Sequence, residues 1–248
     1  MTAAKFNFSP DEIAKRWPRM TNAATTPDQE AAADRDEKDR IGRAEEARRR
    51  ADAERFLVVR GGRYRNCRLS NFEAELRGQA DAVARLRDYL EHLPEHVERG
   101  HNIVLFGPSG TGKDHLATAM AYAAIRRGGY SVAYTAGLDL YARLRATIDG
   151  RADEADVITP LVKADILLLS DPIPPIGELT RYQTEVLYRI IDARYSHPRP
   201  TWVTLNVASG AEASDRLSPP VYDRLRHGAT AVYCDWPSYR QPQERDER

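Results

Sequence analysis

The residues with the clearest chemical meaning lie in one stretch near the middle of the chain. An apolar run at 103–106 precedes the loop Gly107-Pro108-Ser109-Gly110-Thr111-Gly112-Lys113, and an alanine-rich helical pattern follows it. This order of strand, G-x-x-x-x-G-K loop and helix is the P-loop arrangement. Backbone N–H groups and the helix N-terminus cradle phosphate oxygens there, and Lys113 adds a mobile cation for the outer phosphates. We therefore predict that ATP binds to this loop and to the two residues after it, Asp114 and His115.

Two positions around this loop depart from the usual pattern for a metal ion. A Ser or Thr normally follows the P-loop lysine and ligates Mg²⁺, but here the residue is Asp114. A carboxylate normally ends the next buried strand, but the apolar run 166–169 is followed by Ser170 and Asp171. In the usual arrangement the first residue of that pair holds the metal and the second activates the attacking water. We predict an Mg²⁺ site formed by Asp114, Ser170 and Asp171, with Asp171 as the catalytic base.

The two departures allow two interpretations. In a ligand swap, Asp114 binds the metal directly, and Ser170 lies behind Asp114 without contacting the metal. In a decayed site, ATP binds weakly or is hydrolysed poorly, because an unneutralised carboxylate beside phosphates repels them. A bound Mg²⁺ would reverse the sign of that effect. Mg²⁺-dependent turnover of Asp114→Ala and Ser170→Ala separates the two.

The elements that must position these residues alternate along the chain. Strand patterns at 103–106, 130–135, 166–169, 202–205 and 229–234 alternate with helical patterns at 138–148, 153–162, 178–195 and 220–226. Such an order predicts an α/β fold with a five-stranded parallel sheet and helices on both faces. Ligands bind at the carboxyl ends of the strands in sheets of this kind. Asn206 ends the strand 202–205, where we expect it to contact the attacking water or the γ-phosphate.

The first part of the chain has a different composition. Residues 28–55 contain ten acidic and eight basic side chains, and Ile41 is their one large aliphatic residue. This predicts a solvated helix or a partly disordered linker, with a partner-binding arm as the alternative. A basic cluster follows (Arg60, Arg63, Arg65 and Arg68, with Tyr64 among them), which either contacts phosphates and adenine or forms a solvated surface.

The overall composition excludes several classes of protein. Lys+Arg and Asp+Glu both number 37, so any nucleic-acid contact must come from a local patch. Cys67 and Cys234 are far apart, which favours neither a disulfide framework nor a zinc site and fits a reducing compartment. No stretch approaches the roughly 18 apolar residues of a membrane span, and no signal peptide is evident. We expect a cytoplasmic protein with no membrane partner.

Several stretches together resemble the DnaC/IstB-type AAA+ ATPases, and within them the bacterial replicative helicase loaders. The first are Asn66-Cys67-Arg68-Leu69-Ser70-Asn71-Phe72, Gly110-Thr111-Gly112-Lys113-Asp114-His115-Leu116-Ala117 and Ala164-Asp165-Ile166-Leu167-Leu168-Leu169. The others are Tyr188-Arg189-Ile190-Ile191-Asp192-Ala193-Arg194, Arg199-Pro200-Thr201, Leu205-Asn206, Asp223-Arg224-Leu225-Arg226 and Trp236-Pro237-Ser238-Tyr239-Arg240. The resemblance covers roughly residues 64–241, and the two C-terminal stretches are far more specific than the P-loop.

The resemblance implies an organisation and a set of roles. Residues 64–241 would form an AAA+ ATPase domain without a full C-terminal lid, between an N-terminal extension at 1–63 and a disordered tail at 242–248. Arg224 would be the arginine finger given in trans to a neighbouring subunit, Asn206 sensor 1 and Arg240 the sensor 2 arginine. In that family the core binds ATP and single-stranded DNA, and the N-terminal region binds a DnaB-type replicative helicase. Only its position suggests that residues 1–63 do so here.

Four functions follow from these observations. The leading one is an ATPase that loads a replicative helicase onto single-stranded DNA, and the second is an IstB-like transposition helper that serves a transposase. They differ in the partner that residues 1–63 capture. A non-hydrolysing, ATP-dependent adaptor is favoured if ATP binds without turnover. A small-molecule kinase would transfer phosphate to a metabolite and gives Arg224 no role between subunits.

Overall fold

The computed structural model describes residues 27–240, so the tail predicted at 242–248 and the first part of the N-terminal extension lie outside the described residues. The chain divides into two compact units, Met1–Glu46 and Ala47–Arg248. This division is earlier than the predicted boundary between residues 63 and 64. The reason is that Ala53, Phe56 and Leu57 are buried in the hydrophobic core of the second unit.

The charged stretch is helical where it is described. It forms most of helix α2, Pro27–Arg60, and residues 30–48 of that helix are exposed. The predicted solvated helix is therefore present from residue 27 onward. Among residues 27–240, none of the helices combines the length and apolar character that crossing a bilayer requires.

The second unit is built on one parallel sheet, as predicted. Its strands are β1 (Ile103–Phe106), β2 (Val132–Ala136), β3 (Ile166–Ser170), β4 (Thr201–Leu205) and β5 (Thr230–Tyr233). Their order is β2-β3-β4-β1-β5, and every neighbouring pair is parallel. All five carboxyl ends therefore meet at one edge of the sheet, where the polar residues predicted to form the site follow the strands.

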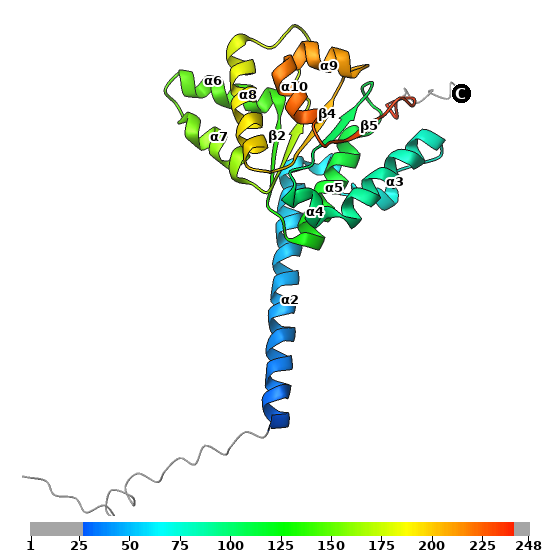
Figure 1. The fold of residues 1–248 in the computed structure, drawn as a ribbon, viewed down its shortest axis with the longest axis vertical. Helices are drawn as coiled ribbons and strands as arrows, with labels where there is room; N and C mark the ends of the chain where they lie inside the picture. Colours follow the sequence, from blue (N-terminus) through cyan, green and yellow to red (C-terminus); the bar gives the residue numbers. More distant parts are fainter. Residues whose placement is uncertain (1–26, 241–248) are drawn as a thin grey trace, which may run out of the picture. The chain divides into compact units, whose positions relative to one another are not determined.

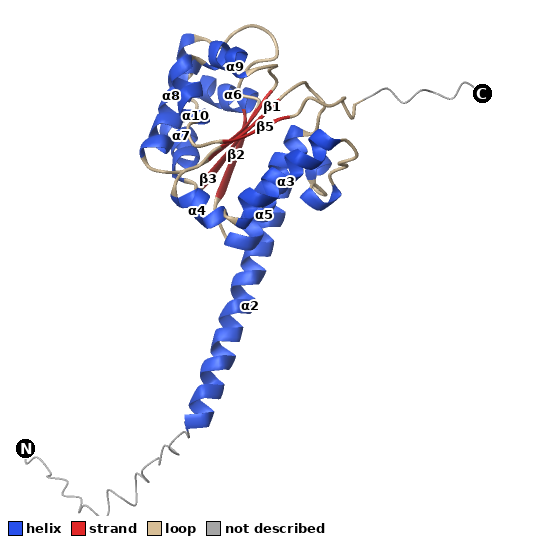
Figure 2. Cartoon of the chain, turned by 45° about the vertical axis from the view of Figure 1, so that its right-hand side comes forward, coloured by secondary structure: helices blue, strands red, loops and turns tan. Residues whose placement is uncertain are grey.

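Helices cover both faces of the sheet (Figures 1 and 2). One face packs against α3 (Arg77–Glu91), α4 (Leu93–Glu98), α5 (Lys113–Gly128) and the last turns of α2. The other packs against α6 (Gly137–Ile148), α7 (Glu154–Lys163), α8 (Arg181–Ser196), α9 (Gly210–Leu217) and α10 (Pro219–Arg226). The sequence did not predict α4 or α9. Helix α8 begins at Arg181 rather than at 178, because the Thr180 side chain accepts a hydrogen bond from the Gln183 N–H and caps it.

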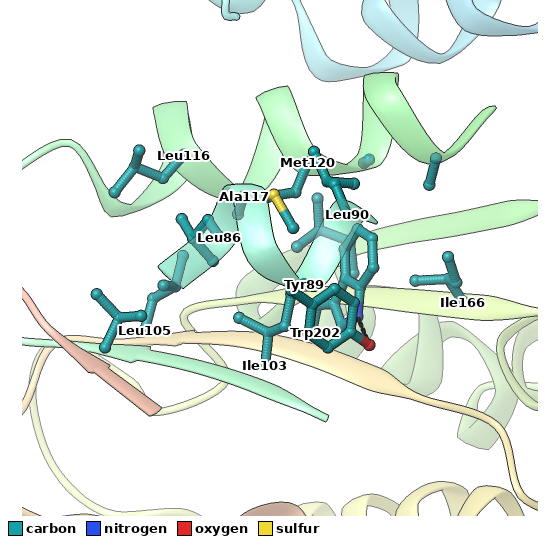
Figure 3. Close-up of a cluster of buried hydrophobic side chains, with 14 of the residues drawn as sticks. Leu86, Tyr89, Leu90, Ile103, Leu105, Leu116, Ala117, Met120, Ile166 and Trp202 are labelled. Atoms are coloured by element: carbon teal, nitrogen blue, oxygen red, sulfur yellow. Dashed lines mark hydrogen bonds between the residues drawn. The ribbon is translucent and has the colours of Figure 1, made fainter. Parts of the chain in front are cut away.

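The core on the α5 side fixes the P-loop helix against the sheet (Figure 3). Met120 of α5 and Leu86 of α3 are fully buried there. The buried Tyr89 hydroxyl donates to the His101 carbonyl at 2.6 Å and accepts from Trp202 Nε1 at 3.2 Å. These two bonds satisfy polar groups inside an apolar cluster, and they join α3 to β4 and to the residues before β1.

The amino ends of the strands are joined by two buried polar side chains. Arg194 of α8, at 1% exposure, uses all three guanidinium nitrogens. Its six acceptors are the carbonyls of Leu161, Val162, Ala164, Asp165 and Pro200 and the Thr201 hydroxyl. Asn102, just before β1, donates to the Arg224 and Leu225 carbonyls and accepts from the Thr201 N–H.

Candidate nucleotide-binding site

A cavity of about 440 Å³ opens at the carboxyl ends of the strands. The residues that we predicted from the sequence and that line it are Ser109, Gly110, Gly112, Lys113, Asp114, His115, Asp171, Asn206 and Arg240. Gly107, Pro108 and Thr111 complete the loop but do not line the cavity, and Ser170 and Arg224 also lie outside its wall. The structure thus brings most of the predicted residues to one place.

The P-loop is shaped against the C-terminal segment 234–239. Gly107 and Gly110 have φ angles of +142° and +87°, which only glycine adopts without strain. A Cβ at Gly107 would collide with the Cys234 carbonyl, and one at Gly110 with the Ser238 side chain. The Tyr239 N–H donates to the Gly110 carbonyl at 3.0 Å, and Trp236 Nε1 donates to the Thr111 carbonyl at 2.8 Å. The glycines are therefore required both for the turn and for this close packing.

Lys113 is buried at the first position of α5. Its Nζ donates to the carbonyls of Gly107 and Pro108 at 2.8 and 2.7 Å, and the Thr111 hydroxyl donates to the Pro108 carbonyl at 3.0 Å. Burial lowers the pKa of Lys113. The ammonium group lies across the loop that would hold the phosphates. When ATP binds, phosphate oxygens could replace the two loop carbonyls as acceptors of the Nζ hydrogen bonds.

Asp114 and Ser170, the two exchanged residues, are in direct contact. The Ser170 hydroxyl donates to Asp114 Oδ1 at 2.7 Å, and the hydroxyl of the buried Thr204 donates to the same oxygen at 3.3 Å. Ser170 is itself buried, so it supports the carboxylate from behind and does not face the cavity. Since these bonds fall on Oδ1, neither engages Oδ2. The ligand-swap interpretation also places Ser170 beside Asp114, and the binding of a metal by Asp114 stays a prediction.

A third group on Asp114 was not expected. Nη2 of Arg60, the last residue of α2, lies 3.5 Å from Asp114 Oδ1. The Arg60 side chain is only 1% exposed, so the alternative of a solvated basic surface is wrong for this residue. The decayed-site interpretation assumed that the Asp114 carboxylate is unneutralised. That assumption is wrong, because the positive charge of Arg60 lies beside this carboxylate.

Asp171 is held in an unusual state directly after β3. Its φ is +44°, a left-handed conformation that costs energy in a residue other than glycine. Its Oδ1 is buried without a hydrogen-bond partner. Burial and the Asp114 carboxylate raise the pKa of Asp171 to about 6, while Lys113 and the Asn206 side chain act in the opposite direction. A carboxyl group with a pKa near the working pH suits a general base.

The oxygen atoms present fit Mg²⁺ when phosphates share its coordination. The described residues contain no group of three His, Cys, Asp or Glu that could hold a metal ion. Mg²⁺ is commonly bound by one or two carboxylates together with substrate phosphates and water. Asp114 and Asp171 both line the cavity, and the orphaned Asp171 Oδ1 is a carboxylate oxygen in need of a partner.

The two C-terminal arginines lie in different surroundings. Arg240 lines the cavity of its own chain. Arg224 does not: it donates to Asp192 Oδ1 at 2.8 Å and to the Tyr188 hydroxyl at 2.9 Å. Its guanidinium group stacks 4.7 Å from the centre of the Tyr188 ring and stays 24% exposed. Arg224 is thus held in one orientation outside its own site.

Other residues of the cavity come from the predicted basic cluster or were not predicted as site residues. Phe72 makes edge contacts with His115 and Tyr239, at ring separations of 5.5 and 5.8 Å. Arg63 and Tyr64 belong to the basic cluster for which phosphate and adenine contacts were one of the two interpretations, and both line the cavity. Cys67, Asn71 and Glu73 also line it and were not predicted. His115 Nε2 lies 3.0 Å from the Arg68 carbonyl, which ties α5 to this segment. Aromatic and polar groups beside a P-loop suit the flat adenine ring of ATP. Most of these residues lie in or beside the stretches 66–72 and 236–240, which could have indicated them from the sequence.

The chain resembles known proteins along most of its length. The model of the IstB-like ATP binding protein family matches residues 17–247. The replicative helicase loader DnaC of Escherichia coli is 29% identical over 181 residues, which cover 71% of this chain and 70% of that protein. An ATP-binding protein of an insertion sequence in Sinorhizobium fredii is 35% identical over 151 residues, covering 58% of this chain and 48% of that one.

A solved structure has the same fold. The crystal structure of the DnaC helicase loader superposes with a TM-score of 0.62 at 22% identity, over 70% of this chain and 99% of that one. At this identity the likeness concerns the fold alone.

Proposed function

The chain belongs to the family of IstB-like ATP-binding proteins and has the AAA+ P-loop fold, and from that premise we propose that it is an ATP-dependent loader of a replicative DNA helicase. The observation that carries the proposal is the extent of the DnaC match. It spans 71% of this chain and 70% of that relative, whereas the insertion-sequence relative matches over 58% and 48%. The partners proposed are a DnaB-type hexameric helicase and single-stranded DNA.

The site residues have defined tasks in this proposal. The P-loop N–H groups and Lys113 hold the phosphates. Asp114 and Asp171 would hold Mg²⁺, which would neutralise the charge of the phosphates. Asp171 accepts the proton of the attacking water, which Asn206 orients. Arg240 contacts the γ-phosphate within the same chain. The reaction is the hydrolysis of ATP to ADP and phosphate.

Arg224 has its task in a neighbouring subunit. Because Asp192 and Tyr188 hold it outside the cavity of its own chain, we propose that it completes the site of a second copy. Arg224→Ala and Lys113→Ala proteins should each lack turnover, and mixing them should restore part of it. An inactive mixture would count against action in trans.

Partner capture is the main test of the loader proposal. The full chain should co-purify with the host's replicative helicase, more strongly with ATP, and a chain that begins at Ala47 should bind it poorly. That starting point keeps Ala53, Phe56 and Leu57, whose loss would damage the core. Absence of helicase binding by the full chain would defeat the proposal.

A transposition helper remains the second candidate, because the insertion-sequence relative has the higher identity, 35% against 29%. Binding to a transposase and not to the helicase would establish it.

Turnover assays address the adaptor alternative. With a ligand swap, Mg²⁺-dependent hydrolysis falls in Asp114→Ala but not in Ser170→Ala, whereas ATP binding without turnover in the unmutated protein indicates a non-hydrolysing adaptor.

A further inference from the structure

Arg60 is held in place from three sides. Its Nε donates to the Thr118 hydroxyl on α5 at 2.9 Å. Its guanidinium group lies between two rings, 4.2 Å from the centre of Tyr64 and 4.1 Å from that of Tyr134. Arginine suits such a position, because its planar cation stacks on aromatic rings and is weakly hydrated. The positive charge is therefore fixed beside the cavity that Tyr64 lines.

One nitrogen of this group is left incomplete. Nη2 is buried, has no hydrogen-bond partner, and lies 3.5 Å from Asp114 Oδ1. Leaving a buried donor unpaired costs free energy. Nη2 therefore interacts with the Asp114 carboxylate as an ion pair and not through a hydrogen bond.

We propose that Arg60 is an internal counter-cation for Asp114, which allows the site to hold the phosphates of ATP without Mg²⁺. The inference rests on the ATP binding of the proposed function. Asp114 stands where other P-loops have a neutral hydroxyl, so its negative charge faces the incoming triphosphate. Arg60 offsets that charge, and the Ser170 and Thr204 hydroxyls keep Oδ1 on its side.

The role predicts a dependence on the metal that a purely structural ion pair would not show. In the absence of Mg²⁺, Arg60 is the cation that neutralises Asp114, so its removal leaves the carboxylate to repel ATP. When Mg²⁺ is present, the metal offsets the same carboxylate and Arg60 matters less. Removing Asp114 together with Arg60 removes both the carboxylate that repels the phosphates and the cation that offsets its charge.

The experiment is a titration of a fluorescent ATP analogue into the full chain, in EDTA and in Mg²⁺. In EDTA, Arg60→Met should weaken binding on the order of 10-fold or more, and in Mg²⁺ it should stay within about 3-fold of the unmutated protein. The double variant Arg60→Met/Asp114→Ser should return to within about 3-fold in EDTA. Arg216→Met is the matched control, since Arg216 lies 3.5 Å from the Glu212 carboxylate but outside the cavity.

The outcomes separate the inference from the proposed function. Equal EDTA affinity of Arg60→Met and the unmutated protein, or a double variant no better than Arg60→Met, overturns the inference alone. Binding by the unmutated protein in Mg²⁺ but not in EDTA does the same. No binding under either condition overturns both. If Arg60→Met does not fold, Asp114→Ser decides: it should bind ATP in EDTA at least as tightly as the unmutated protein, and weaker binding contradicts the counter-cation role.

Discussion

Buried polar groups at the two ends of the sheet differ in how completely they are hydrogen-bonded. At the amino ends, Arg194 and Asn102 engage all of their side-chain nitrogen and oxygen atoms in hydrogen bonds. At the carboxyl ends, Arg60 Nη2 and Asp171 Oδ1 are buried without a hydrogen-bond partner, and Asp171 has a positive φ. Complete hydrogen bonding makes a polar group part of the framework, whereas the incompletely bonded groups serve the site: Arg60 lies beside the Asp114 carboxylate, and Asp171 lines the cavity.

Arg194→Met should give the largest effect at the amino ends. The change leaves five carbonyls and a hydroxyl without their donor, and we expect the free energy of unfolding to fall by about 3–5 kcal/mol. ATP affinity of the folded protein should stay the same. Urea unfolding measures the loss, with the exposed Arg189→Met of the same helix as control. A stable variant with weakened ATP binding would contradict the comparison.

Lys113→Ala should have the reverse profile at the carboxyl ends. It removes the cation that lies across the P-loop, so ATP affinity should fall on the order of 100-fold, or about 2.7 kcal/mol. The free energy of unfolding without nucleotide should change by less than about 1 kcal/mol, because the loss of two hydrogen bonds is offset when an ammonium group no longer has to be buried. Calorimetric titration with ATP and urea unfolding test the two halves. A large loss of stability would show that Lys113 belongs to the framework.

Asn102→Ala should act on stability again, but less strongly. Its amide caps the last carbonyls of α10 and anchors the first residue of β4, and we expect a loss of about 2 kcal/mol. Thermal unfolding without nucleotide measures it, with Asn66→Ala on the surface as the control. An unchanged midpoint would mean that water replaces the amide.

Asp171→Asn should produce the smallest change and one of opposite sign. Folding raises the pKa of this acid from 3.8 to about 6. The folded state therefore loses stability as pH rises between these values and stays weakened above them. The variant should be more stable by about 1 kcal/mol at pH 8 in EDTA, after allowance for partial solvation.

The pH dependence of that gain is its diagnostic feature. Below about pH 3 the Asp171 carboxyl is neutral in both the folded and the unfolded state, so the gain should vanish there apart from any preference of Asn for the positive φ. Asp192→Asn is the matched control, because this carboxylate is paired with Arg224 and its loss should bring no gain. Equal gains at about pH 3 and pH 8 would contradict the ionisation argument.

The sheet was predictable because its strands are short runs rich in β-branched, aromatic and other apolar residues, bounded by polar residues. Helices α4 and α9 were not, since they have six and eight residues and few apolar positions. The boundary between the units was missed for a related reason. Ala53, Phe56 and Leu57 are a small apolar set at the end of a long charged helix, and their burial depends on packing against the rest of the core.

The site was predictable where its residues adjoin a motif. Asp171 and Asn206 directly follow strands, so the parallel topology itself places them beside the P-loop. The contact between Asp114 and Ser170 followed from the reciprocal exchange of residue types. Arg60 could not be found in this way, because its approach to Asp114 arises only when the end of α2 packs beside Tyr134 of β2 and Thr118 of α5.

The packing of segment 234–239 against the P-loop has a consequence for synthesis on the ribosome. Strand β1 has both of its sheet neighbours, β4 and β5, later in the chain, and the loop after it is held by Trp236 and Tyr239. Chains emerge N-terminus first, so the nucleotide site is the last part of the second unit to be completed. A nascent chain stalled before Trp236 would display the P-loop sequence without its binding geometry.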